Sequence, residues 1–156
     1  MISPNSASVV SLWVDRERPP RSLGINLSSS VVIVMGDKMT FEKYSEKDWL
    51  IKAETLPRLQ FINLMRHARA LVGNSSMGIL EAPHYKLPVV NIGNRQQGRL
   101  NAGNVEFVPY INDEIIIAVE KATLDDEYRQ KIKNLKKYFG DSSAPQKVME
   151  AIESVD

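Results

Sequence analysis

The run Gly-Asn-Ser-Ser-Met-Gly at residues 73–78, hereafter the serine turn, combines the residue types that hold a phosphate group. Ser75 and Ser76 carry hydroxyl donors, and the two glycines allow backbone to approach a ligand closely. A helix that begins here would add unpaired backbone N–H groups and the positive end of its dipole. The turn therefore predicts an anion site, although an ordinary helix N-cap has the same pattern.

Glu81 follows Ser76 by just over one helical turn. A carboxylate at this place can accept hydrogen bonds from the two hydroxyl groups of a ribose, which is how such sites select nucleotides over free phosphate. The alternative is a charge on the solvated face of a helix. If the functional interpretation holds, the serine turn and Glu81 together bind a nucleotide rather than a bare anion.

A second polar segment, residues 91–99, follows an apolar stretch and reads Asn-Ile-Gly-Asn-Arg-Gln-Gln-Gly-Arg. Arg95 lies where a strand would end, and a guanidinium can contact two phosphate oxygens at once. A solvated basic loop is the competing interpretation. The density of polar side chains next to a predicted strand end favours a functional loop.

Alternating apolar and polar segments predict the elements that position these residues. Pro57 starts one helix, and Asn112, Asp113, Ser142 and Ser143 supply N-cap oxygens for two others. Residues 19–30 and 37–48 are expected to be exposed and irregular. The predicted strands are 31–35, 49–53, 70–73, 88–92 and 105–109, and the predicted helices are 7–16, 59–67, 77–85, 113–122, 126–138 and 144–154.

This alternation predicts an α/β fold with a Rossmann-like parallel sheet and helices on both faces. Such sheets bind ligands beyond the carboxyl ends of their strands. That rule brings the serine turn, the 91–99 segment and the turn near Asn5 to one edge. No strand is expected before the helix at 7–16, so the sheet would lack its first strand. An exposed edge of this kind would allow a homodimer.

Composition excludes several classes of function. Hydrophobic residues make up 43% and charged residues 25% of the 156-residue chain, as in an ordinary single globular domain. The formal net charge of +1 gives no general attraction to nucleic acid or to an anionic membrane. The chain has no cysteine and two histidines, so no metal site and no cofactor are expected. Without a predicted membrane span or signal peptide, we expect a soluble cytoplasmic protein.

From Leu56 to its end, the chain resembles the hydrolysing branch of the UDP-N-acetylglucosamine 2-epimerase family, whereas residues 1–55 match that family poorly. The combination of an Asn-Ser-Ser turn, a Glu-Ala pair and an Arg-Gln-x-Gly-Arg run is highly specific. The matching segments are Leu56-Pro57-Arg58, residues 73–78 with Glu81-Ala82-Pro83, residues 88–93, Arg95-Gln96-Gln97-Gly98-Arg99 and residues 140–144.

The resemblance assigns roles to the phosphate-binding residues. Ser75 and Ser76 would contact the diphosphate of UDP, with Gly78 beside them. Glu81 would hold the ribose hydroxyls. Arg95 would lie beside the phosphates of the nucleotide sugar.

Two further positions enter the UDP site by the same resemblance. Leu56 would lie against the uracil through its backbone. Asn5 would correspond to an asparagine in the first turn of the family's nucleotide-binding half, although Ser6-Ala7-Ser8-Val9 replaces the family's usual continuation.

The resemblance also implies an architecture and a reaction. The family fold has two Rossmann-like halves facing a cleft, as in B-type glycosyltransferases, and UDP lies mainly on the C-terminal half. The reaction removes UDP by anti-elimination and then adds water, giving N-acetylmannosamine. The acid and base carboxylates and a hinge histidine belong to parts that this chain does not match. His67 and His84 are expected to be structural or surface residues, so no catalytic residue is assigned here.

Three interpretations stay open. The chain is either half of a hydrolysing epimerase that needs an N-terminal partner, or a stand-alone UDP-sugar-binding module without catalysis. The third alternative is the C-terminal half of a UDP-sugar glycosyltransferase, against which the Arg-Gln-x-Gly-Arg run argues. A domain that has lost its ligand is the remaining, less favoured explanation.

Overall fold

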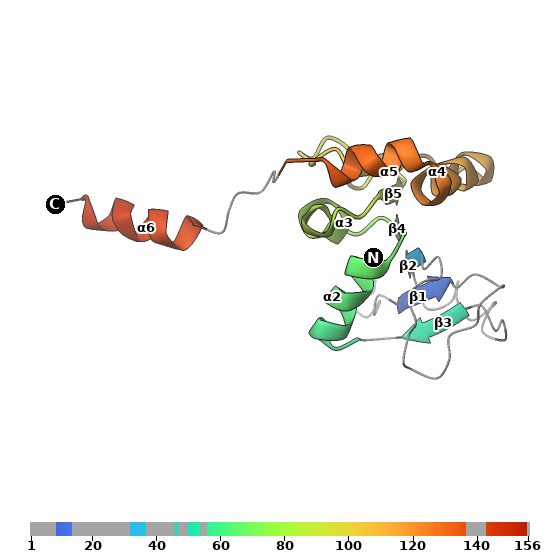
Figure 1. Ribbon diagram of the computed structural model, residues 1–156, viewed down its shortest axis with the longest axis horizontal. Helices are drawn as coiled ribbons and strands as arrows, with labels where there is room; N and C mark the ends of the chain where they lie inside the picture. Colours follow the sequence, from blue (N-terminus) through green and yellow to red (C-terminus); the bar gives the residue numbers. More distant parts are fainter. Residues whose placement is uncertain are drawn as a thin grey trace, which may run out of the picture.

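A computed structural model describes residues 9–13, 32–36, 46, 50–53, 56–136 and 143–155 of the chain. Asn5, the predicted loop at 19–30 and most of the predicted excursion at 37–48 lie outside these residues. The described strands form one sheet in the order β3-β1-β2-β4-β5-β6 (Figure 1). Their bounds are β1 Val9–Trp13, β2 Val32–Gly36, β3 Leu50–Ala53, β4 Ala70–Gly73, β5 Val89–Ile92 and β6 Val105–Val108.

Four neighbouring strands of the sheet, β2, β4, β5 and β6, run parallel. Gly73 at the end of β4 lies opposite Asn91 of β5, so these two strands end next to each other. The predicted strands 70–73, 88–92 and 105–109 are therefore confirmed to within one residue at each end. The parallel α/β sheet predicted from the sequence is present in this part of the chain.

The prediction of a helix at residues 7–16 is wrong. Val9–Trp13 is a strand, β1, which pairs antiparallel with both β2 and β3. Val9 and Val10 are β-branched and favour extended backbone, but one isolated segment cannot show that two strands lie ready to pair with it. The sheet is consequently mixed, and β1 lies inside it, between β2 and β3.

Helices cover both faces of the parallel strands (Figure 1). The helix α2 (Arg58–His67) begins after β3 and ends just before β4, and α4 (Asn112–Leu124) follows β6. The predicted helix 126–138 ends at Lys133, and Ile111 rather than Asn112 or Asp113 occupies the N-cap position of α4. The helices are α2 Arg58–His67, α3 Met77–Leu80, the 3-10 helix η1 Ala82–Tyr85, α4 Asn112–Leu124, α5 Asp126–Lys133 and α6 Ala144–Glu153.

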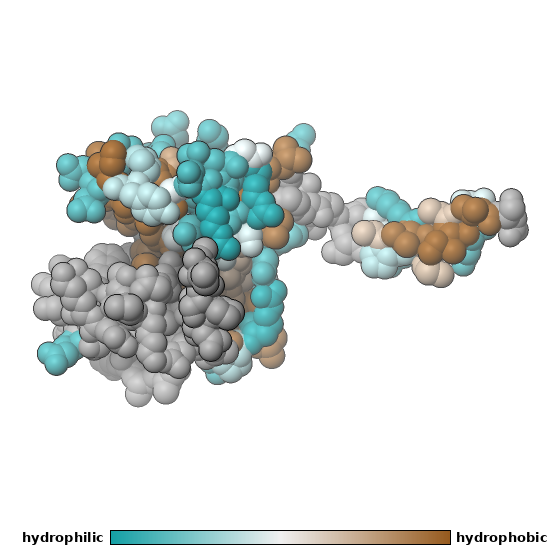
Figure 2. Space-filling model, turned by 180° about the vertical axis from the view of Figure 1, so that it is seen from behind, coloured by the Kyte–Doolittle hydropathy of each residue, from teal (hydrophilic) through white to brown (hydrophobic). Residues whose placement is uncertain are grey.

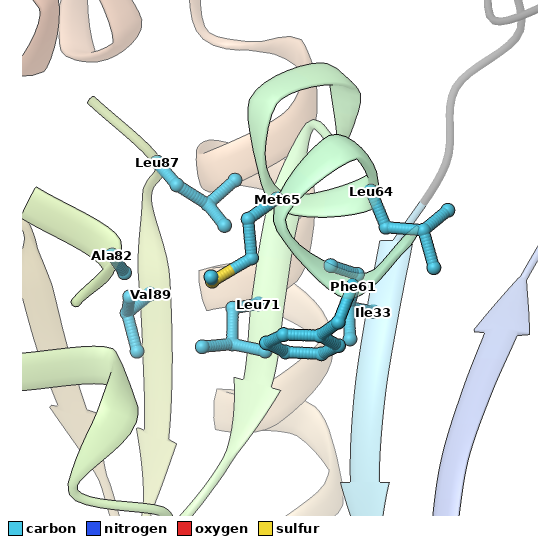
Figure 3. Close-up of a cluster of buried hydrophobic side chains, with 8 residues drawn as sticks. All are labelled: Ile33, Phe61, Leu64, Met65, Leu71, Ala82, Leu87 and Val89. Atoms are coloured by element: carbon cyan, nitrogen blue, oxygen red, sulfur yellow. The ribbon is translucent and has the colours of Figure 1, made fainter. Parts of the chain in front are cut away.

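The first core lies between α2 and one face of the sheet (Figure 3). Successive strand residues point to opposite faces, so Leu71 and Val89 point to this side together with Ile33. Phe61 and Met65 of α2 pack against them, whereas Leu59, on the same helix, is 76% exposed. This core fixes α2, and therefore the start of α2, relative to β4.

The second core lies on the other face of the same strands. Val72 and Val90, the neighbours of the residues in the first core, contact Ala118 and Ala122 of α4. A small residue at each contact lets the helix approach the sheet closely. The prediction of helices on both faces is confirmed by these two clusters.

The predicted helix at 77–85 is interrupted at Glu81. The four-residue α3 ends at Leu80, and the chain continues as η1. Pro83 has no N–H with which to continue the helical ladder, and its ring restricts the residue before it. The buried side chain of Asn104 donates from Nδ2 to the Gly78 carbonyl at 3.2 Å and to the Leu87 carbonyl at 3.1 Å, which ties this irregular segment to the sheet.

The helix α6 is set apart from the sheet and its covering helices (Figure 1). All of its residues are exposed, and Val148, Met149 and Ile152 form an uncovered apolar stripe along it (Figure 2). Within the described part of the chain, no helix has the length and apolar character needed to cross a membrane.

Replacing Gly78 with alanine is expected to destabilise the fold by about 1–3 kcal/mol. A Cβ at this position would lie 2.7 Å from Cγ1 of Val89, a buried β-branched side chain that cannot easily move away. Urea unfolding of the two proteins measures the difference. Gln60→Ala, at an exposed position of α2, is the control for introducing an alanine where no side chain is crowded. Equal stability of Gly78→Ala and the parent chain would contradict this packing role.

Candidate functional site

One edge of the sheet collects the segments predicted to bind a ligand. β3 runs in the same direction as β2 because both pair antiparallel with β1. The carboxyl ends of β3, β4 and β5 therefore lie at the same edge. Leu56 follows the first of these strands, the serine turn the second, and the arginine loop, residues 93–99, the third. Ligands of parallel α/β sheets bind at this edge.

The serine turn contains backbone donors that no hydrogen bond among the described residues uses. Gly73 has φ 149°, a backbone conformation that favours glycine. The carbonyl of Ser75 accepts from the Gly78 N–H at 3.2 Å, and that of Ser76 accepts from the Leu80 N–H at 2.9 Å. Within the described residues, the N–H groups of Ser75 and Ser76 make no hydrogen bond. Both serines are partly exposed, so these donors can reach a ligand.

The hydroxyl of Ser75 donates to no acceptor among the described residues. Its Oγ accepts from the Met77 N–H at 3.4 Å, which uses a lone pair and leaves the O–H proton for another acceptor. The helix that follows, α3, has only four residues. Its dipole is correspondingly small, so the attraction for an anion rests on the local N–H and hydroxyl donors rather than on the long helix dipole expected from the sequence.

Glu81 forms an ion pair with Arg58 at the start of α2. The distance between Oε2 of Glu81 and Nη2 of Arg58 is 2.6 Å. The hydrogen bond to this carboxylate, and then its charge, raise the pKa of the Arg58 guanidinium. Oε2 is buried, whereas the Arg58 side chain is 64% exposed. The pair therefore orients Glu81 and leaves its other oxygen, Oε1, as the acceptor available to a ligand.

The arginine loop carries an exposed guanidinium. Arg95 is exposed, and it forms no ion pair with a carboxylate among the described residues. The loop is closed by a bond from the Gln97 N–H to the Asn94 carbonyl at 3.0 Å. Gly93 and Gly98 have φ 81° and 77°, so both turns of the loop require left-handed backbone. Arg95 is thus displayed on a defined loop and can bind an anion.

A buried side chain joins the two segments. Gln96 is only 3% exposed, and its Nε2 donates to the Asn74 carbonyl at 3.0 Å. Its Oε1 accepts from Nη1 of Arg99 at 2.7 Å. The arginine loop is therefore bonded directly to the serine turn. Because of this contact, the serine turn and the arginine loop form one candidate site.

The remaining predicted residues have different surroundings. Leu56 is partly buried and packs against the first core beside α2. Asn5 lies outside the described residues. His67 contacts the carbonyl of Asn63 through Nδ1 at 2.7 Å, within its own helix. In the described ranges, no three His, Asp or Glu side chains gather as a metal site would require.

The sequence did not reveal two residues of this edge. The sequence pattern assigns no role to Gln96 within the Arg-Gln-x-Gly-Arg run, or to Arg58 after Leu56 and Pro57. A polar residue in the middle of a loop gives no local sign that it will be buried. The partner of Glu81 is likewise invisible in sequence, because Arg58 reaches it only through the packing of α2 on the sheet.

Comparison with known proteins gives a match over most of the chain. A family model described as UDP-N-acetylglucosamine 2-epimerase matches residues 26–153. The matched range contains β2 to β6, the serine turn, Glu81 and the arginine loop.

Three curated relatives are similar over shorter stretches. A GDP/UDP-N,N'-diacetylbacillosamine 2-epimerase (hydrolyzing) of Campylobacter jejuni is 46% identical over 52 residues, 33% of this chain and 14% of the relative. A UDP-N-acetylglucosamine 2-epimerase of Neisseria meningitidis is 39% identical over 62 residues, 40% of this chain and 16% of the relative. A UDP-N,N'-diacetylbacillosamine 2-epimerase (hydrolyzing) of Legionella pneumophila is 39% identical over 67 residues, 43% of this chain and 18% of the relative. The matched stretches thus span less than a fifth of each relative's length.

Proposed function

Because the chain belongs to the UDP-N-acetylglucosamine 2-epimerase family, we propose that it is the UDP-binding part of a hydrolysing 2-epimerase. The observation that carries the proposal is the bond from Gln96 to the Asn74 carbonyl, which holds the arginine loop against the serine turn. Relatives whose names include the word hydrolyzing support the choice of branch. The complete enzyme would convert UDP-N-acetylglucosamine to N-acetylmannosamine and UDP.

The diphosphate binds at the serine turn in this proposal. The N–H groups of Ser75 and Ser76 are unpaired within the described residues, and the Ser75 hydroxyl retains its proton. Arg95 supplies a positive charge from the neighbouring loop. Neutral donors and one guanidinium around the same point match a group that carries several anionic oxygens.

The nucleoside is recognised by Glu81, between α3 and η1, and by Leu56, just before α2. Glu81 presents Oε1 to the ribose hydroxyls while Arg58 holds Oε2. Leu56 lies on the same edge of the sheet, one strand further, where its backbone lies beside the uracil ring. A carboxylate that is already held by an ion pair loses little conformational freedom when the ribose binds.

These contacts contribute to the reaction by stabilising the leaving group. Elimination breaks the bond between carbon 1 of the sugar and a phosphate oxygen, and negative charge grows on the departing UDP. Donors from Ser75, Ser76 and Arg95 that are already in place stabilise this charge as it develops. The carbon 2 proton must be removed by a carboxylate base. We assign that base, and its acid partner, to the facing half of the enzyme and to no residue of this chain.

Isothermal titration calorimetry tests the proposal. UDP is expected to bind saturably with one site per chain, whereas uridine and inorganic pyrophosphate, which each contain half of the recognised features, bind much more weakly. The absence of both a heat signal and a thermal shift with UDP would overturn the proposal. UDP binding equalled by pyrophosphate would reduce the site to a general anion site.

Glu81→Ala is expected to weaken UDP binding by about tenfold, because hydrogen bonds to charged groups contribute about 1.5–3 kcal/mol. The variant should also lose the preference for UDP over deoxy-UDP, since the carboxylate is proposed to contact the ribose hydroxyls. Calorimetry with both nucleotides measures the two affinities. Glu114→Ala, on the exposed first turn of α4, is the control for removing one carboxylate. An unchanged preference in Glu81→Ala would show that this residue does not contact the ribose.

A further inference from the structure

Gln96 has an unusual position for a loop glutamine. It is 3% exposed, although its neighbours Arg95 and Gln97 are exposed. Both ends of its side-chain amide are used: Nε2 donates to the Asn74 carbonyl at 3.0 Å, and Oε1 accepts from Arg99 at 2.7 Å. A buried amide that lost either partner would carry an unsatisfied polar atom. The side chain therefore has one strongly preferred place.

The acceptor of this bond lies within the serine turn. Asn74 directly precedes Ser75, so its carbonyl belongs to the peptide unit that carries the Ser75 N–H. A bond to that carbonyl fixes the orientation of the same peptide plane, because the peptide unit is rigid. Gln96 thus sets the direction of one proposed phosphate donor.

The same side chain also fixes the loop that carries Arg95. Arg99 bonds to Gln96 through its side chain, and its N–H bonds to the Gln96 carbonyl at 3.3 Å. The loop contains two glycines with positive φ, which are easily deformed when nothing holds them. Gln96 anchors the loop at its centre, one residue from Arg95.

We propose that Gln96 is a positioning residue that aligns the Ser75 N–H and the Arg95 guanidinium on one diphosphate. This inference rests on the proposed function. Gln96 makes no contact with the ligand in it, and acts through the serine turn and Arg95. The catalytic contribution of such a residue is the alignment of donors before charge develops on the leaving group.

Gln96→Glu separates the two bonds of the side chain. The carboxylate still accepts from Arg99, but it has no donor for the Asn74 carbonyl and repels it. UDP affinity is expected to fall by at least about tenfold. Gln97→Glu introduces the same charge at the exposed neighbour and should change the affinity by less than about twofold. Equal affinities of the two variants would overturn the inference, and absent UDP binding by the parent chain would instead overturn the proposed function.

A double-mutant cycle with Arg95→Ala distinguishes positioning from a general loss of structure. If Gln96 acts through Arg95, Gln96→Glu should cost clearly less UDP affinity in the Arg95→Ala background than in the parent chain. Losses that multiply in the double variant would show that the two residues act independently, contrary to the inference. Calorimetry on the four proteins, each with its thermal midpoint recorded, gives this result.

One measurement uses the parent chain alone and needs no substitution. In the parent chain, the side-chain amide protons of Gln96 are expected to exchange slowly with solvent and to shift in the NMR spectrum when UDP is added. Rapid exchange, or a signal that UDP leaves unchanged, would contradict the alignment of the two loops by this side chain.

Discussion

Replacing Arg95 with alanine is expected to weaken UDP binding by about 10- to 100-fold, because a charge-assisted contact to phosphate contributes about 1.5–3 kcal/mol. Arg95 is exposed and lies on the loop that Gln96 bonds to the serine turn. The side chain packs against no core cluster, so the thermal midpoint of the empty protein should remain within about 1 °C of the parent value. The loss should shrink as salt concentration rises, since part of it is electrostatic.

Calorimetry with UDP at two salt concentrations measures this effect. Arg66→Ala is a matched control, because Arg66 is also an exposed arginine but lies in the last turn of α2, at the opposite end of that helix from the site. The control should bind UDP like the parent chain. If Arg66→Ala and Arg95→Ala bind UDP equally well, Arg95 is not part of the site.

Leu71→Ala is expected to lower the free energy of unfolding by about 2–5 kcal/mol, the usual cost of a buried leucine-to-alanine change. Leu71 is 2% exposed at the centre of the first core, where Phe61 and Met65 of α2 pack over it (Figure 3). In the parent chain, Cδ2 of Leu71 lies 3.6 Å from the position that a Cβ on Gly78 would occupy. The cavity left by alanine therefore lies directly below the serine turn.

Urea unfolding and a thermal scan measure the loss, which corresponds to a fall in the midpoint of roughly 5–20 °C. Leu59→Ala provides the control, because Leu59 belongs to α2, the helix that covers this core, but is 76% exposed. It should change stability by less than about 0.5 kcal/mol. A Leu71→Ala protein as stable as Leu59→Ala would mean that the α2 core does not support this part of the sheet.

Sequence patterns predicted the parallel part of the fold well. Short apolar runs mark β4 and β5 because strands buried on both faces need apolar side chains in both directions. Leu71 and Val72 illustrate this, since one belongs to each core. Helix α2 was equally clear from its apolar spacing. In these segments, local preference and tertiary packing favour the same structure.

The N-terminal strand could not be predicted in the same way. Residues 9–13 contain apolar side chains at spacings that suit either a helix or a strand. The choice is made by β2 and β3, which pair with the segment on both sides. Hydrogen bonds to strands that are distant in the sequence cannot be recognised from the segment itself. Pairing with these strands therefore decides for a strand where the local pattern also allows a helix.

The residue types of the candidate site could be predicted from the sequence, but the contacts between its segments could not. The chemistry of Ser75, Ser76 and Arg95 could be inferred, because hydroxyls and guanidinium groups at strand ends suit a phosphate. Pro83 is visible in the sequence, but the sequence pattern predicts a helix over 77–85 and does not show that α3 ends at Leu80. The ion pair of Arg58 with Glu81 and the hydrogen bonds of the buried Gln96 depend on three-dimensional packing. These contacts hold the separate sequence motifs together at one edge of the sheet.

The amide NMR spectrum of the nitrogen-labelled chain, recorded during a UDP titration, tests the central claim most directly. The account predicts saturable shifts of the Ser75 and Ser76 amides together with the side-chain signal of Arg95, while the exposed helix α6 stays unchanged. Saturable UDP binding that leaves the serine turn unshifted, and moves signals elsewhere in the chain instead, would contradict it.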